Sequence, residues 1–155
     1  MLWGSTLDRL AIKGYVVAEV TKGGVLLARV EGENVVHTPG KNLIAASLIA
    51  NSGPAPAATQ FIQAIAVGSG PATIDELATT LSAEITRAAY TTASALGNVI
   101  QYQHAFTNGG VTWNVQEAGL FTALAAGIMV ARWLTQGLSV PNAAILTINW
   151  SLTIG

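Results

Sequence analysis

This chain has few charged residues and no cysteine. Only 10% of its 155 residues are charged, against roughly 25% in an ordinary soluble domain, and none is cysteine. The missing cysteines exclude disulfide bonds, thiolate chemistry and cysteine-ligated zinc. A chain that is 51% hydrophobic with so little charge has few groups to cover a free surface. We therefore expect much of that surface to lie against copies of itself or against a larger partner.

Clusters of basic residues and long apolar runs are missing as well. The net charge is −1, and the seven lysines and arginines form no run, so nucleic-acid binding lacks its electrostatic support. The longest apolar stretch, residues 120–131, is shorter than the roughly 20 residues of a spanning helix. No secretory signal is recognisable at the start of the sequence. We expect neither nucleic acid nor a membrane as partner.

What the sequence does have is a repeated strand pattern. Runs rich in valine, isoleucine and aromatic residues alternate with turn signals such as Gly23-Gly24 and Asn108-Gly109. In the last run, residues 144–154, apolar and polar residues alternate from residue 146 onward, as in a strand with one buried face. This run and the earlier ones predict strands over residues 16–20, 25–30, 35–38, 61–67, 84–93, 99–106, 111–121, 128–134 and 144–154.

Helical spacing is confined to a small part of the chain. It predicts one short α-helix near residues 41–50, after a break at Pro39-Gly40, and a second short helix over residues 74–81. A turn is expected at residues 32–34. The sequence thus predicts a mainly β fold, an antiparallel β-sandwich or barrel-like domain over residues 15–155, preceded by an N-terminal arm over residues 1–14.

No group of residues predicts catalysis. His37 and His104 lie in expected strands without a neighbouring carboxylate, and no serine has the spacing of a nucleophile elbow. Two histidines and eight dispersed carboxylates give no metal-ligand spacing. Residues 68–70 have no Gly-Lys-Ser/Thr continuation and predict a turn, not a phosphate loop. We expect no enzyme activity, no cofactor and no metal.

One carboxylate stands out because it lies inside an apolar strand. Glu117 is followed by Ala118, and a lone charge in a sheet costs free energy unless it is paired. Arg87 and Arg132 also lie in apolar strands, so either could form a structural ion pair with it.

The tryptophans are the largest apolar groups. Trp150 is expected in the core, because it shares the apolar face of the last strand. The arm contains large apolar side chains and two glycines but little strand pattern, and we expect the large side chains to bind a neighbouring subunit; they are Leu2, Trp3, Leu7 and Leu10.

Seven segments carry a resemblance to a known group of proteins. They are residues 34–36, 40–44, 65–70, 75–77, 117–121, 127–132 and 146–154. In order and spacing they resemble small β-rich virion proteins of tailed bacteriophages, over about three-quarters of the chain. The resemblance implies a structural component of a phage particle, without catalytic residues.

Three functions follow as expectations. The leading one is a capsid decoration (cement) protein that binds the major capsid protein on the head surface and forms a homo-oligomer, a trimer by analogy. The second is a tail-fibre or baseplate-associated structural module. The third, from another class, is a carbohydrate-binding module for adsorption, which would need an exposed aromatic platform.

Overall fold

The fold is seen in a computed structural model, and the structure describes residues 11–49, 62–71, 73 and 75–155. These residues form nine strands and one helix. In chain order they are β1 (Ile12–Lys22), β2 (Val25–Val36), α1 (Thr38–Ile49), β3 (Ala64–Gly68), β4 (Glu84–Ala89), β5 (Thr92–Leu96), β6 (Val99–Thr107), β7 (Trp113–Phe121), β8 (Met129–Val140) and β9 (Ile145–Ile154).

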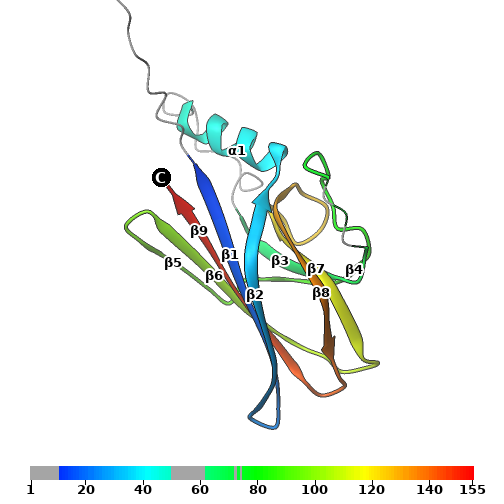
Figure 1. The fold of residues 1–155 in the computed structure, drawn as a ribbon. Helices are drawn as coiled ribbons and strands as arrows, with labels where there is room; N and C mark the ends of the chain where they lie inside the picture. The colour runs from blue at the N-terminus through cyan, green and yellow to red at the C-terminus, as the bar shows by residue number, and fades with distance from the viewer. Residues whose placement is uncertain (1–10, 50–61, 72, 74) are drawn as a thin grey trace, which may run out of the picture.

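All nine strands belong to one antiparallel sheet, in the order β4-β3-β7-β8-β2-β1-β9-β6-β5. Its two end strands, β4 and β5, are consecutive in the chain and are joined by residues 90–91 alone. The sheet therefore curls into a half-barrel, with α1 above the ends of β1 and β2 (Figure 1). This confirms the expected mainly β, barrel-like class.

The core fills the inside of the curl. It is built from the inward-facing side chains of both halves of the sheet, such as Val16 and Val20 of β1 and Val115 of β7. In β9, Leu146, Ile148 and Trp150 are buried, while the residues between them are half-buried on the outward face. The expected core position of Trp150 is confirmed.

The expected turn at residues 32–34 is wrong, because β2 runs through it without a break. Gly32 and Asn34 are residues typical of turns, but here each one lies beside the indole group of a tryptophan. A Cβ on Gly32 would lie 3.3 Å from Nε1 of Trp133, so a glycine there leaves room for the ring. Asn34 accepts a hydrogen bond from Nε1 of Trp150 at 3.2 Å, and its side chain occupies the space beside Gly14 that a Cβ would need. Gly32 and Asn34 therefore accommodate the two tryptophans and do not form a turn.

The helix begins earlier than predicted, at Thr38. Pro39 does not break it, since proline lacks an N–H that the first helical turn leaves unbonded in any case.

The second expected helix is wrong: the described part of that segment, residues 75–81, contains turns and no helix. Two of its carbonyl groups accept hydrogen bonds from residues outside the segment instead. The Glu76 oxygen accepts from Thr38 N at 3.0 Å, and the Thr79 oxygen accepts from Met129 N at 3.2 Å.

The sheet also begins earlier than the expected end of the arm. Ala11 and Gly155 exchange two backbone hydrogen bonds, of 3.0 and 2.8 Å, and β1 follows at Ile12. Residues 11–14 are therefore part of the sheet and not of an arm. Residues 1–10 lie outside the described residues.

Candidate functional site

The carboxylate of Glu117 is buried inside the sheet and accepts four hydrogen bonds. The residue lies in β7 between Gly68 of β3 and Leu134 of β8, and it is fully buried. Its Oε2 accepts from Nη2 of Arg132 at 2.5 Å, which confirms the expected ion pair with that residue. A buried carboxylate of this kind is stable only because a charge and several donors compensate it.

Three backbone N–H groups complete the shell around Glu117. Gly70 N and Ala83 N donate to Oε1 at 3.1 and 2.9 Å, and Ser82 N donates to Oε2 at 3.1 Å. A Cβ on Gly68 or Gly70 would lie within 2.7 Å of Oε1. The glycines predicted to form a simple turn therefore leave the space that the carboxylate needs. Glu117 fastens the segments around residues 70 and 82–83 to the sheet.

Arg132 binds a second side of the same segments. It is only 4% exposed, and it donates to the Thr73 carbonyl at 2.8 Å and to Ser82 Oγ at 3.0 Å. Its Nε has no hydrogen-bond partner among the described residues. The pair of Glu117 and Arg132 thus holds the loops around residues 70, 73 and 82–83 against the sheet.

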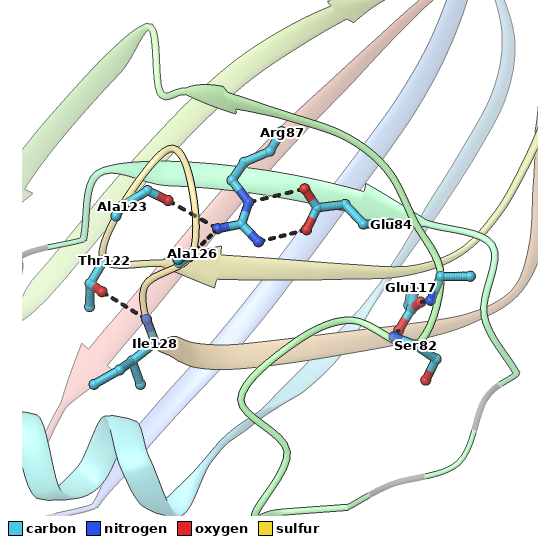
Figure 2. A network of polar contacts seen from close by, with 9 residues as sticks. Ser82, Glu84, Arg87, Glu117, Thr122, Ala123, Ala126 and Ile128 are labelled. Atoms are coloured by element: carbon cyan, nitrogen blue, oxygen red, sulfur yellow. Dashed lines mark hydrogen bonds and ion pairs between the residues drawn. The ribbon is translucent and has the colours of Figure 1, made fainter.

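Arg87, the other candidate partner of Glu117, forms a different cluster. Its guanidinium binds Glu84 at 2.6 Å and donates to the carbonyl oxygens of Ala123 at 3.1 Å and Ala126 at 2.6 Å (Figure 2). It also lies 3.6 Å above the ring centroid of Phe121. Arg87 therefore closes the loop between β7 and β8, and its predicted pairing with Glu117 is wrong.

The two histidines are held in different ways. His37 is buried, and its Nδ1 lies 3.1 Å from the Ala78 carbonyl oxygen. Burial lowers the pKa of His37, and the charge of Arg132 acts in the same direction. His104 lies 3.0 Å from Thr91 Oγ1, and burial lowers its pKa too. Among the described residues, no three histidine, aspartate or glutamate side chains gather into a group that could hold a metal ion.

The tryptophans give little surface for stacking on a sugar. Trp133 and Trp150 are buried, and Trp113 is half-buried in β7. Trp3 lies outside the described residues, as do the other arm residues expected at an interface, Leu2, Leu7 and Leu10.

The hairpin of β1 and β2 projects beyond the rest of the sheet (Figure 1). Val25, Leu26 and Leu27 are consecutive and are 62%, 54% and 51% exposed. Leu26 pairs with Thr21, which pairs in turn with the exposed Ile145 of β9, so Leu26 and Ile145 lie on either side of Thr21. We call these four residues, Val25, Leu26, Leu27 and Ile145, the hairpin-tip patch. Exposed apolar groups that cluster in this way mark surfaces for protein contact.

The outward face of β1, β9, β6 and β5 has a different character. It carries a shallow groove of about 390 Å³ between rows of uncharged polar side chains. Gln103 Nε2 donates to Asn149 Oδ1 at 2.8 Å across the groove, and the ring of Tyr15 lies at its edge, 40% exposed. The other lining residues are Val17, Thr92, Ser94, Gln101, Tyr102, Trp150 and Ser151.

Comparison with known proteins identifies no relative. No family model, no curated protein and no solved structure matches the chain. In the described part of the chain, no helix combines the length and the apolar character needed to cross a membrane.

Proposed function

We propose that the protein is a structural component of a bacteriophage particle, in first place a decoration protein that binds and stabilises the head shell. The observation that carries the proposal is the hairpin-tip patch. Three consecutive large apolar side chains at the end of a projecting hairpin cost free energy in water, and a partner surface removes that cost.

The rest of the described chain is consistent with such a role. A decoration protein acts by occupying many equivalent positions, and each bound copy stabilises the assembled shell by mass action. This needs rigid contact surfaces. The curled sheet provides one, since the Glu117–Arg132 pair and the Arg87 cluster both serve to hold loops in place. A location on the tail stays the alternative, and the trimer stays a prediction from analogy.

The proposal is tested by counting copies on purified phage particles that carry the protein. Quantitative mass spectrometry should find hundreds of copies per particle, and labelled antibody should mark the head uniformly. A few copies confined to the tail would favour the alternative. No copies in purified particles would contradict both.

The hairpin-tip patch can be tested separately. Leu26→Lys should abolish binding of the purified protein to heads stripped of it, because a charge would have to be buried in the contact. Val111→Lys is the matched control, since Val111 is also highly exposed but lies in the loop between β6 and β7, outside the patch. Equal binding by both variants would remove the patch from the proposal.

A second candidate, a carbohydrate-binding module, is favoured by the groove on the outward face. Uncharged amide and hydroxyl groups beside an exposed tyrosine ring suit neutral sugars better than charged ligands. Titration with neutral oligosaccharides, followed by the NMR signals of groove residues such as Gln103, tests it. Absence of shifts at millimolar sugar would dismiss this candidate.

A further inference from the structure

The strand edges of the half-barrel differ in how well they are protected. An unpaired edge presents backbone N–H and C=O groups that can pair with another strand, and proteins usually block it with charge, proline, a bulge or a cover. In the described sheet, β4 and β5 are the two outermost strands, and each has an open edge. It also opens between β2 and β8, which pair only through Val35 and Val36.

Three of these edges carry a block. On β4, Glu84 and Arg87 form an ion pair. The open part of β2 carries Arg29, Glu31 and Glu33, of which the first two are paired. The open part of β8 is distorted by Gly137, whose φ is 109°, and by a register shift against β7.

Among the described residues, β5 carries none of these blocks. Residues Thr92–Leu96 are Thr-Ala-Ser-Ala-Leu, all five are exposed, and they pair with β6 in an unbroken register. In an antiparallel strand, alternate residues direct their backbone groups away from the neighbour, so part of the β5 backbone faces the open side. No Asp, Glu, Lys or Arg occurs in residues 88–116, the stretch of sequence that contains β5 and its neighbour β6.

We infer that β5 pairs edge to edge with β5 of a second copy of this chain. Antiparallel pairing about a two-fold axis at Ser94 sets Ser94 opposite its own copy. It sets Ala93 opposite Ala95, and Thr92 opposite Leu96. Every pair joins uncharged side chains, and no pair joins two large ones, so two backbones can approach without repulsion or overlap. The contact is the same on both copies and closes on itself, as two-fold interfaces do.

The lack of charge also favours a second copy of this chain as the partner. A charged peptide or nucleic acid would find no complementary group between residues 88 and 116, whereas an identical neutral edge complements the backbone fully. The pairing joins β5 and β6 of both copies into one continuous sheet. It deepens the proposed structural role by naming the surface through which copies join. It predicts a dimer, in place of the trimer expected by analogy.

The first experiment measures the mass of the full chain by analytical ultracentrifugation from 1 to 200 µM. The unchanged protein should approach twice the chain mass. Ser94→Lys places two like charges at the axis and should raise the dimer dissociation constant about fivefold or more. Gln101→Lys is the matched control, because Gln101 pairs with Ser94 inside the sheet and is one strand away from the edge. It should dimerise like the unchanged protein.

A second experiment does not depend on added charge. The chain has no cysteine, so a single introduced cysteine can form a disulfide only between copies. Ser94→Cys should cross-link to a dimer under mild oxidation, and Gln101→Cys should not. A monomer at 200 µM, a trimer, or a dimer that neither Ser94→Lys weakens nor Ser94→Cys cross-links would overturn the inference. Failure of the virion proposal is seen separately, as absence of the protein from purified particles while the purified chain still dimerises.

Discussion

The two ends of the sheet differ in how they meet water. At the β3–β7 end, all five residues of β3 and residues 117–121 of β7 are buried. One face lies on the main core, and the other lies on a second cluster that includes Leu81 and Phe121. At the β5–β6 end, all of β5 is exposed, and β6 alternates between exposed and covered positions. We call these the covered end and the bare end.

The difference shows what two-sided burial demands. A strand covered on both faces reads as a continuous apolar run, because neither face returns to water. Every polar group in such a run has to be satisfied inside the protein, as Glu117 is by four donors. A strand covered on one face needs no such compensation, and its outer residues are left to solvent or to a partner. The covered end therefore carries stability, and the outer residues of the bare end, like the hairpin-tip patch, are available for assembly.

The largest expected effect removes the compensation at the covered end. Glu117→Ala leaves Arg132 without its counter-charge and three N–H groups without an acceptor, so it should lower the free energy of unfolding by about 3–5 kcal/mol. Urea denaturation measures the loss. Glu84→Ala breaks an ion pair that is partly exposed to solvent and should cost clearly less. A loss below about 1 kcal/mol for Glu117→Ala would show that the carboxylate is not a fastening point.

The next effect concerns the helix that covers the sheet. A Cβ on Gly40 of α1 would lie 2.4 Å from the carbonyl oxygen of Val130, so Gly40→Ala forces the helix away from β8. Overpacking of this kind costs about 1–3 kcal/mol, less the gain of up to about 1 kcal/mol from better helix propensity. Gly109→Ala is the control, because nothing lies within 4 Å of its added methyl group. Equal denaturation midpoints for the two variants would contradict close packing of α1 on β8.

The sequence predicts some features of the core and of the buried ion pair, and it does not predict others. Alternation in residues 146–154 predicts Trp150 in the core, because one-sided burial leaves a period of two. An isolated charge in an apolar run identified Glu117 as a paired carboxylate. The choice between Arg87 and Arg132 was not predictable, since it depends on which arginine lies beside β7 after folding. Gly32, Gly68 and Gly70 resembled turn residues, whereas in the fold they leave space for an indole and a carboxylate.

Other features depend on contacts that no local pattern carries. Residues 75–81 have helical spacing, but the carbonyl oxygens of Glu76 and Thr79 accept hydrogen bonds from Thr38 and Met129, outside the segment. The missing block on β5 is visible in the sequence only after the strand order is known, since an uncharged strand in the middle of a sheet would need none. The charge-free stretch at residues 88–116 was nevertheless a signal that could have been read.

A smaller effect concerns the dependence of stability on pH. Burial lowers the pKa of His37 in the folded protein below its usual value of 6.5. The unfolded chain then binds more protons than the folded chain once the pH falls below about 6.5, so stability is present above that pH and is lost as the pH falls toward the folded pKa. Melting temperatures measured from pH 7.5 to 5 should decline, and His37→Gln should flatten the decline. An unchanged pH profile in His37→Gln would assign the effect to other groups, such as His104.

The smallest effect is expected for an amide at the bare end. Gln103 donates to Asn149 across the outer groove, but both side chains can bond to water instead, so Gln103→Ala should change the free energy of unfolding by no more than about 0.5 kcal/mol. The matched buried amide is Asn108, which is fully covered and donates to the carbonyl oxygens of Val111 and Val140, both at 2.8 Å. Asn108→Ala should cost about 1–3 kcal/mol, since it leaves buried acceptors unpaired. The ratio of the two losses, measured in the same urea titration, tests whether water can replace protein contacts on the outer face. If Gln103→Ala costs as much as Asn108→Ala, the groove is a rigid part of the fold, and the bare end is no more free for assembly than the covered one.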